Sequence, residues 1–399
     1  MPAKILCGDF YQLPPVPASA SLLAPVERQS YEHLQGRKLL MDIEHIVDFV
    51  QMKRFDDPLL IQIIEAMRVP GGRKISDEAW RAIEATRIQE AGGADQLAPE
   101  TDPRLRDARG WYECAYEWRI VSYAMHTHAR LNAKASGALL YYIPSVDLPS
   151  VRLSKQQFHE MRAMPNIGMT AKLPGILPIY VGMEMILSDS YLPPRIVRGA
   201  PVVVVDIELH PSEPPLPGRS SIAAHGAVVL HFMPPCIYVR LKNRTDLFLV
   251  SASGSSQTGG QDLRGVIAIQ PTTKAWRFKG KDMPSAVAVN RRQIPLLPMK
   301  QCTLHGVQGK TTEPGIIAHW SYPVGLNPEL KWFACYVTLS RPPRLAALLS
   351  HGLPDRAIIE GGPPQSIADA FEHMFSAKIR ATRKACATAR AAMKWPSRP

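Results

Sequence analysis

The fold is decided by three short segments: Gly8-Asp-Phe-Tyr-Gln-Leu-Pro-Pro15, Cys302-Thr-Leu-His-Gly-Val-Gln-Gly-Lys-Thr311 and Tyr336-Val-Thr-Leu-Ser-Arg341. Each places polar groups directly after a run of strand-forming residues. In open α/β sheets, ligands bind beyond the carboxyl ends of the strands. We therefore predict an α/β fold in which these three segments line one cleft.

The regions around the three segments favour alternating helices and strands. Apolar spacing predicts helices over 39–50, 59–67 and 126–138, and a helix that starts at Ser76-Asp77-Glu78 after the Pro70-Gly71-Gly72 break. Short β-rich runs predict strands over 3–10, 120–124, 315–319 and 333–339.

The middle of the chain has a different character. An apolar stretch over 176–187 is broken at Gly182-Met183, and six short strand-like runs follow it. These runs cover residues 201–209, 227–233, 236–241, 247–251, 265–270 and 286–289, with Pro, Gly and Ser clusters between them. The pattern predicts a small β-barrel inserted into the α/β fold.

The charge balance points to a polyanionic partner. The chain has 399 residues with 47 Lys and Arg against 35 Asp and Glu, a net charge of +12. Nucleic acid is the first candidate for such a chain. No apolar run is long enough to span a bilayer, so we expect a soluble intracellular protein that binds no membrane. The six cysteines form no C-x-x-C pair and are expected to be reduced.

Three residues of these segments suit phosphoryl transfer. The Gln12 amide can donate to and accept from a phosphate, Arg341 could act as an arginine finger, and Gly309 would let backbone approach a phosphate. Other interpretations stay open, since Gln12 could be an ordinary loop residue and Arg341 a surface ion-pair partner. Gly309-Lys310-Thr311 is not a Walker A motif, because Leu304 stands where that motif requires glycine.

The three segments resemble conserved motifs of the Pif-one-like (Pif/RecD) branch of superfamily-one DNA helicases. GDFYQLPPV is similar to motif III, CTLHGVQGKT to motif V and YVTLSR to motif VI. Met52-Lys-Arg-Phe55, together with Arg68, resembles the motif IV region. The stretch over 177–187 resembles an apolar segment of the same family. The resemblance covers roughly residues 1–352 and keeps the order of the motifs.

The resemblance implies a role for eight residues. Catalytic roles would fall to Gln12, Arg54 and Arg341, nucleotide contacts to Asp9, Gln12, Gln308, Gly309 and Arg341, and DNA-backbone contacts to Thr303 and His305. Asp9 would sit beside the metal and water network, and no residue of this chain is assigned as a metal ligand. The cofactors would be ATP and Mg²⁺, held mainly by a part that precedes motif III in the family.

The resemblance also implies a domain plan. Residues 1–50 would be the last part of a RecA-like domain 1A, and residues 51–190 with 296–360 a complete RecA-like domain 2A. Residues 191–295 would form an SH3-like 2B β-barrel inserted in 2A, and residues 361–399 a basic helical tail.

The sequence departs from the family pattern at several points. Gly306 and Val307 replace a lysine and a serine of motif V, Phe55 replaces a glutamine, and Pro342-Pro343 follow motif VI. Walker A and Walker B are absent. We therefore expect the C-terminal portion of an ATP-dependent 5′–3′ helicase that is inactive by itself. The alternative is a non-catalytic helicase relic that binds single-stranded nucleic acid.

The expected partners are single-stranded DNA and fork DNA, with the chain as a monomer and a 1A domain supplied by a longer parent chain. A nuclear location is expected, with a mitochondrial one as the alternative. Telomere, repair and mobile-element roles are not separated by these motifs.

Three further features allow two interpretations each. The segment 377–399 has seven Lys and Arg and no acid, so it is either a solvated helix or a phosphate-binding arm. His126 and His128 have the spacing of a metal pair on a strand, but no carboxylate or cysteine lies near them in sequence, which favours a structural role. Aromatic residues between Trp111 and Tyr142 could stack on bases or anchor the core.

Overall fold

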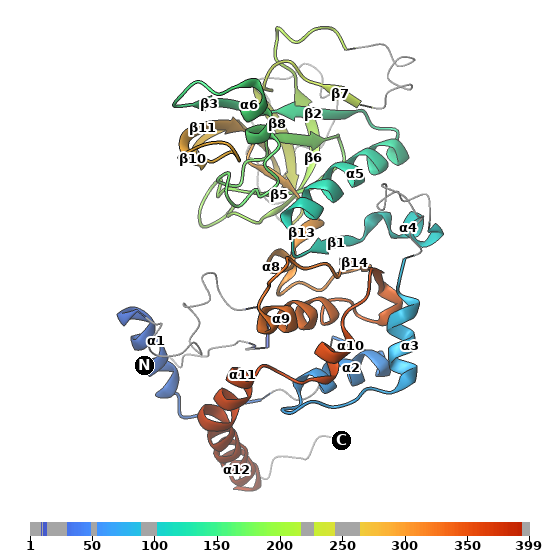
Figure 1. Ribbon diagram of the computed structural model, residues 1–399, viewed down its shortest axis with the longest axis vertical. Coiled ribbons are helices and arrows are strands. Elements are labelled where there is room, and N and C mark those ends of the chain that lie inside the picture. The colour runs from blue at the N-terminus through green and yellow to red at the C-terminus, as the bar shows by residue number, and fades with distance from the viewer. Residues whose placement is uncertain are drawn as a thin grey trace. The chain divides into compact units, whose positions relative to one another are not determined.

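The structure of the protein is a computed structural model that describes residues 9, 11–13, 30–48, 54–88, 102–216, 227–243 and 264–392 (Figure 1). The chain forms two compact units. Unit 1 consists of Met1–Gln89 and Leu304–Pro399, and unit 2 consists of Glu90–Thr303. No helix in the described ranges has the length and hydropathy needed to cross a bilayer. The strand predicted over 247–251 lies outside the described residues, and so does the strand predicted over 3–10 apart from Asp9.

Unit 1 combines helices with a pair of parallel strands. Its described elements are α1 (Tyr31–Met41), α2 (Pro58–Arg68), α3 (Asp77–Ala85), α8 (Leu304–Val307), β14 (Ile316–His319), α9 (Pro328–Leu339), η4 (Leu345–Ala347), β15 (Leu348–His351), α10 (Arg356–Glu360), α11 (Gln365–Ala370), η5 (Phe371–Ser376) and α12 (Ala377–Ala392). Strands β14 and β15 pair in register from Ile316 opposite Leu348 to His319 opposite His351. The strand predicted over 315–319 is confirmed as β14.

Helix α2 confirms the helix predicted over 59–67 and holds Arg68 in place. The Asp57 carboxylate accepts the backbone N–H groups of Leu59 and Leu60 at 3.0 and 3.2 Å, and Pro58 occupies the first helical position. The buried side of α2 contacts α3, α9 and α10; it consists of Leu60, Ile63, Ile64, Ala66 and Met67. This packing fixes the end of the helix.

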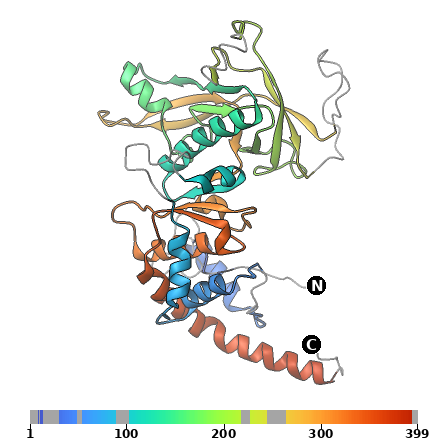
Figure 2. The same cartoon turned by 90° about the vertical axis from the view of Figure 1, so that its right-hand side faces the viewer.

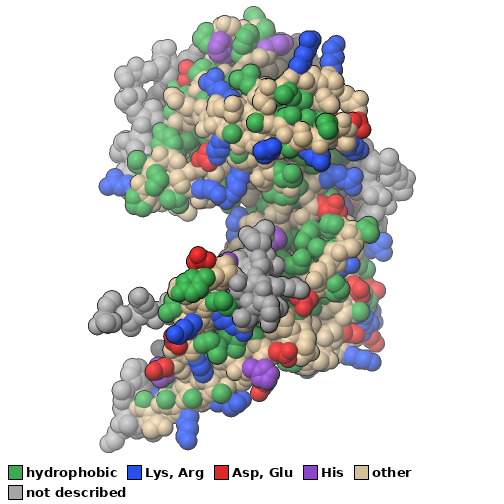
Figure 3. Space-filling model, turned by 60° about the vertical axis from the view of Figure 1, so that its left-hand side comes forward, with side chains coloured by type: hydrophobic (Ala, Val, Ile, Leu, Met, Phe, Trp, Pro, Cys, Tyr) green, Lys and Arg blue, Asp and Glu red, His purple; other side chains and the backbone are tan. Residues whose placement is uncertain are grey.

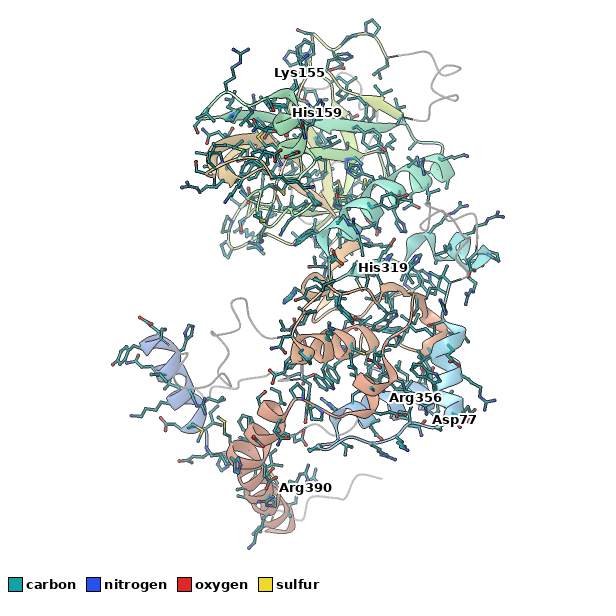
Figure 4. The ribbon with its side chains drawn as sticks, in the orientation of Figure 1. Asp77, Lys155, His159, His319, Arg356 and Arg390 are labelled. Atoms are coloured by element: carbon teal, nitrogen blue, oxygen red, sulfur yellow. The ribbon has the colours of Figure 1, made fainter. Side chains whose placement is uncertain are left out.

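Helix α3 starts where the sequence predicted. The Ser76 hydroxyl accepts the Ala79 N–H at 3.2 Å and caps the helix. Arg356 of α10 lies 3.3 Å from the Asp77 carboxylate and 2.9 Å from Glu360, and its guanidinium covers the Trp80 ring (Figure 4). These contacts tie α3 to α10.

The strand predicted over 333–339 is wrong, because these residues form the second half of helix α9. The Asn327 side chain accepts the Glu329 N–H at 2.8 Å and starts the helix just before Pro328. All eight residues from Trp332 to Leu339 are buried. A helix buried on all sides has no polar face, so its sequence lacks the helical periodicity that would distinguish it from a strand.

The prediction of a helix over 39–50 is also wrong in its extent. Helix α1 ends at Met41, and residues 43–48 are not helical. Side chains of α12 bind this backbone instead. Lys378 Nζ donates to the Ile43 carbonyl at 2.8 Å, and Thr382 Oγ1 accepts the Ile46 N–H at 3.0 Å. Such bonds give a backbone an alternative to helical hydrogen bonds. The predicted C-terminal helix is confirmed over Ala377–Ala392.

Unit 2 is mostly strands. Its described elements are α4 (Pro103–Asp107), η3 (Ala108–Gly110), β1 (Tyr112–Ala115), α5 (Trp118–Ser136), β2 (Leu140–Pro144), β3 (Val146–Pro149), α6 (Lys155–Arg162), β4 (Ile176–Ile179), β5 (Glu184–Leu187), β6 (Pro201–Glu208), β7 (Ala227–Val229), β8 (Cys236–Leu241), β9 (Val266–Ile269), β10 (Thr272–Phe278), β11 (Val287–Gln293), β12 (Leu296–Pro298) and β13 (Gln301–Thr303).

The strands of unit 2 form several small sheets (Figure 2). The largest has five strands in the order β12-β5-β6-β8-β9, and each neighbouring pair is antiparallel. A second sheet has the antiparallel order β10-β11-β3. In the third, β2 pairs antiparallel with β4 and parallel with β7. Strand β1 pairs in parallel with β13.

Helix α5 corrects one prediction, the strand over 120–124, and confirms another, the helix over 126–138. Residues 120–124 are helical, although Ile120-Val121-Ser122-Tyr123 has a strand-like composition. Val121, Ala124 and Met125 are buried at helical spacing, so tertiary packing overrides the local β preference. His126 and His128 lie on this helix as predicted, so the strand-like spacing of a metal pair does not apply to them.

A buried ion pair organises the second sheet. Arg291 on β11 and Asp147 on β3 are both fully buried, with 2.6 Å between Arg291 Nε and Asp147 Oδ1. The guanidinium also donates to the carbonyls of Leu173 at 3.2 Å and Met161 at 3.0 Å. It lies over the Trp276 ring at 4.9 Å. Arg291 thus has a partner for its charge and further acceptors for its donors.

The α/β fold class is confirmed, with parallel and antiparallel strands in one chain. The strand runs at 201–209, 236–241 and 265–270 correspond to β6, β8 and β9, and the run over 176–187 to β4 and β5. Strand β10 was not predicted. The SH3-like character of the 2B barrel and the domain boundaries given above stay predictions.

Candidate functional site

The turn at residues 9–13 is organised by Asp9. The Tyr11 N–H donates to Asp9 Oδ1 at 3.1 Å, and the Gln12 N–H donates to the Asp9 carbonyl at 3.3 Å. A carboxylate that accepts the N–H two residues on forms an Asx-turn. The Gln12 amide nitrogen then lies 3.4 Å from Asp9 Oδ2. Asp9 therefore fixes where the Gln12 side chain points.

Arg68 and Tyr336 hold Asp9 from the other side. Arg68 at the end of α2 lies 3.6 Å from Asp9 Oδ1, and the Tyr336 hydroxyl lies 3.5 Å from Asp9 Oδ2. Burial, and then the Asp9 charge, raise the pKa of Tyr336 far above its ordinary value, so the hydroxyl remains a donor. The turn and helix α9 thus meet through Asp9 in unit 1.

A cluster of aromatic rings supports the turn. The Tyr11 ring stacks on Phe371 of η5 with centroids 5.0 Å apart and an interplanar angle of 14°. Trp332 and Tyr336 on α9 stack at 5.3 Å, and the Arg68 guanidinium lies 4.8 Å from the Tyr11 ring centroid. We call these four rings and Arg68 the aromatic clamp. It joins the turn to both α9 and the C-terminal helices.

Two arginines approach the end of α9. Arg54 Nη1 donates to the Ser340 carbonyl at 2.9 Å. Arg341 is 1 % exposed, and its guanidinium donates to the Val337 carbonyl at 3.0 Å, to the Lys310 carbonyl at 3.2 Å and to Ser340 Oγ at 2.7 Å. Arg341 follows a helix, so the prediction that it ends a strand is wrong.

The electrostatic environment of Arg341 is unfavourable for its charge. Burial, and then the neighbouring Arg54, lower the pKa of Arg341 to about 10. Among the described residues, no carboxylate forms an ion pair with Arg341. The Asp9 carboxylate offsets part of this effect on the pKa of Arg341 without forming an ion pair with it. An anion bound against the two guanidinium groups would stabilise their charges further.

The segment over 302–311 contacts both the turn and the residue that follows α9. Gln308 Nε2 donates to the Leu13 carbonyl of the turn at 3.4 Å, and the Lys310 carbonyl accepts from Arg341. Gly309 has φ +79°, and no atom lies within 4 Å of the position that a side-chain Cβ would take. The open, positive-φ backbone at Gly309 is suited to close approach by a ligand.

The structure therefore brings six of the eight predicted residues into one connected set within unit 1: Asp9, Gln12, Arg54, Gln308, Gly309 and Arg341. His305 lies on α8 in the same unit, and burial lowers its pKa, which favours the neutral imidazole. Thr303 ends β13 in unit 2. The individual roles of these residues stay predictions.

Sequence reasoning missed the aromatic clamp. The sequence did point to Arg68 as a site residue, because it stands at the arginine position of the pattern that resembles motif IV. Phe371 had none, since it lies beyond the last motif. Among the aromatic residues proposed for base stacking, Tyr142 packs against His126 with centroids 5.7 Å apart.

The second histidine of α5 has a structural partner. His128 Nε2 contacts the buried Glu113 carboxylate of β1 within hydrogen-bonding distance. Burial lowers the pKa of His126. The two histidines are two residues apart on a helix, which turns them to different sides.

No protein-family model and no curated protein sequence matches this chain. It is similar to several solved structures of Pif1 helicases. The Candida albicans Pif1 helicase is 17 % identical, with 92 % of this chain and 67 % of that chain covered and a TM-score of 0.45. Bacteroides Pif1 bound to ssDNA is 15 % identical, with 92 % and 65 % covered and a TM-score of 0.48.

Bacteroides Pif1 in complex with ADP-AlF3 and ssDNA is 15 % identical, with 93 % of this chain and 66 % of that chain covered and a TM-score of 0.47. The chain thus spans about two thirds of the length of each of these helicases.

Proposed function

We propose that unit 1 carries the γ-phosphate-sensing turn and the arginine finger of an ATP-dependent DNA helicase that moves 5′ to 3′ on a single strand. The observation that carries this proposal is the approach of Arg54 and Arg341 to the end of α9, where neither forms an ion pair with a carboxylate of the described residues. Phosphoryl transfer is catalysed mainly by cations positioned around the transferred group. The terminal phosphate of ATP would supply the anion that these arginines lack.

The hydrogen bonds of the turn suggest how nucleotide and DNA would be coupled. Gln12 would contact the phosphate, and Asp9 would hold its amide in place. A shift of the turn would reach α9 through Tyr336 and α8 through Gln308. His305 on α8, with Thr303 just before it, is where the family resemblance puts backbone contacts to single-stranded DNA.

The described residues at this site do not form a magnesium site. Asp9 is the carboxylate of the turn. Its two oxygens already accept from the Tyr11 N–H, Gln12 and Tyr336, and it forms an ion pair with Arg68. Mg²⁺ prefers six oxygen ligands with few protein donors and several waters. We assign no step to Mg²⁺ in this chain, and we propose that a P-loop outside it holds the nucleotide phosphates.

A non-catalytic DNA-binding role is the second candidate. The sequence contains no G-x-x-x-x-G-K-[ST] motif, which is the observation that favours this role. Such a protein would bind single strands through its positive charge in a salt-sensitive way.

The experiment that separates the two starts from the natural protein, captured with an antibody against the C-terminal helix. Its intact mass and its ATP turnover with single-stranded DNA are measured together. A helicase gives a mass well above 44.2 kDa and DNA-stimulated turnover. Arg341→Ala in that protein should lower kcat by roughly 10³- to 10⁵-fold, as expected for an arginine finger.

The 399-residue chain is the matched comparison. We expect no measurable ATP turnover from it. Turnover in this chain that Arg341→Ala abolishes would contradict the assignment of the phosphate cradle to another part. A natural mass of 44.2 kDa with no response to ATP would favour the non-catalytic role.

A further inference from the structure

Helix α12 is strongly basic and carries no acidic residue. Its sequence, AKIRATRKACATARAA, contains five Lys and Arg. Figure 2 shows α12 as a long helix extending from the rest of unit 1. Figure 3 shows Lys and Arg side chains at the lower end of the molecule, among acidic, His and hydrophobic side chains.

One face of α12 contacts the segment between α1 and residue 48 in the same unit. Lys378 Nζ donates to the carbonyls of Met41 and Ile43, and the buried Thr382 hydroxyl accepts the Ile46 N–H. Lys378 and Thr382 are four residues apart and thus lie on the same side of the helix. These contacts fix which side of α12 faces the rest of unit 1.

The remaining basic residues lie on the opposite side. At 3.6 residues per turn, Arg380, Arg383, Lys384 and Arg390 fall within about 120° of one another around the helix axis. All four are exposed. We call these four residues the α12 basic face, and Figure 4 shows Arg390 near the end of the helix.

The charges of the α12 basic face are largely uncompensated. Arg383 lies 3.6 Å from the partly exposed Asp48 carboxylate. In the described part of the chain, no ion pair is formed by Arg380, Lys384 or Arg390. Arg380 and Lys384 stand at i and i+4, where like charges destabilise a helix by a few tenths of a kcal/mol. A fixed row of exposed cations with this spacing suits a polyanion.

We propose that the α12 basic face binds the phosphate backbone of single-stranded nucleic acid. This extends the proposed function by adding a second contact for the same strand. A membrane surface is the weaker occupant, because interfacial helices insert large apolar side chains and the apolar residues of α12 are nearly all alanine. Ile379 is the largest of them.

The test compares oligonucleotide binding by two variants that lose the same charge. The first changes Arg380, Arg383, Lys384 and Arg390 to glutamine. The control changes four exposed basic residues of unit 2 to glutamine: Arg152, Lys155, Lys279 and Lys281. A labelled 20-nucleotide oligothymidine is titrated by fluorescence anisotropy at several salt concentrations.

Each phosphate contact to a single strand contributes about 0.7 to the slope of log K against log salt, or roughly 5-fold in affinity at 0.1 M salt. Losing two to four contacts should therefore weaken binding roughly 25- to 600-fold and lower the slope by about 1.4 to 2.8. The control variant should lose much less affinity for the oligonucleotide. Equal loss in both variants would show a general charge effect and overturn the proposal.

A second readout reports the location directly. Lys384 should be protected from acylation when the oligonucleotide is bound, whereas Lys155 should react as in the free protein. The circular dichroism spectrum of the α12 variant should retain the helical signal of the unchanged protein. An effect confined to duplex DNA, or binding to phosphatidylserine vesicles without binding to the oligonucleotide, would overturn the assignment to single strands.

The failure of this proposal is distinguishable from failure of the proposed function. The binding assay contains no ATP, so it can succeed in a protein that has no turnover. Turnover lost with Arg341→Ala can likewise be observed whether or not α12 binds the strand.

Discussion

Two buried arginines should respond in opposite ways when their charge is removed. Arg341 and Arg291 are 1 % and 0 % exposed. Arg291 is paired with Asp147, whereas Arg341 has Arg54 as a charged neighbour and no carboxylate partner among the described residues. We predict that Arg341→Met stabilises unit 1 and that Arg291→Met destabilises unit 2.

The magnitude for Arg341 follows from its pKa, which falls from 12.5 to about 10 because of burial and Arg54. One pKa unit corresponds to about 1.4 kcal/mol, so the charge costs unit 1 about 3 kcal/mol at neutral pH. For a base with a lowered folded pKa, this cost is complete below the folded pKa and disappears only as the pH rises through about 10 and above.

Methionine also removes hydrogen bonds, which reduces the gain. The Lys310 carbonyl loses the Arg341 donor, at a cost of about 1–2 kcal/mol. The Val337 carbonyl keeps the Ser340 hydroxyl, which donates to it at 3.0 Å. The expected net change in the free energy of unfolding of unit 1 is a gain of about 1–2 kcal/mol.

Arg291→Met leaves the Asp147 carboxylate buried, with the Ser145 hydroxyl at 2.6 Å as its one remaining side-chain donor among the described residues. Breaking a buried ion pair in this way costs about 3–5 kcal/mol. The two substitutions are chemically identical, so their opposite signs test the presence of the partner charge.

Hydrogen exchange in denaturant, read by mass spectrometry on peptides from α9 and from β11, gives the free energy of opening for each unit separately. Arg341→Lys keeps a buried charge and should show no gain. The reasoning fails if Arg341→Met destabilises unit 1 by more than about 1 kcal/mol, or if the lysine variant gains as much as methionine.

Three further predictions concern stability. Asp57→Ala should cost unit 1 about 2–3 kcal/mol in chemical denaturation, because Asp57 caps α2 and also accepts the Leu345 N–H at 2.8 Å; a loss below about 0.5 kcal/mol would contradict this. Gly309→Ala should cost about 1 kcal/mol from its positive φ alone, since no atom lies within 4 Å of the added Cβ, and a larger loss would point to a steric clash. Burial lowers the pKa of His126 and His305, so stability should fall as the pH drops below about 6.5, the unfolded value, and glutamine at both positions should flatten that pH profile.

The sequence predicted the connected site better than the elements that carry it. Asp9, Gln12, Gln308 and Arg341 were identified from short motifs and do lie together in unit 1. Motif spacing is tied to the chemistry of the site, so it can be recognised when the secondary structure is assigned wrongly. Arg341 illustrates this, because it occupies the predicted site from the end of a helix.

The errors in secondary structure have two physical causes. Helix α9 is buried on every side, and helix α5 begins with β-branched and aromatic residues; in both, the local sequence resembles a strand. The second cause is long-range contact. Residues 43–48 are held by Lys378 and Thr382, which lie more than 300 positions away in the sequence. A local sequence pattern cannot predict such a contact.

Strand β10 was missed although its signal was present. Its buried residues Trp276 and Phe278 alternate with exposed ones, which is the period-two pattern of a half-buried strand. The aromatic clamp had no comparable signal, because Tyr11 and Phe371 are brought together by the fold alone.

Unit 1 is built from two segments of the chain that are synthesised at different times. Residues 1–89 and 304–399 form this unit together, and residues 90–303 stand between them. At a translation rate of 5–20 residues per second, the first half waits roughly 10–40 s for the second. During that time the apolar side of α2 has neither α9 nor α10 to cover it. A chaperone acting on the nascent chain would find its binding segment there, and would be displaced as α9 leaves the ribosome.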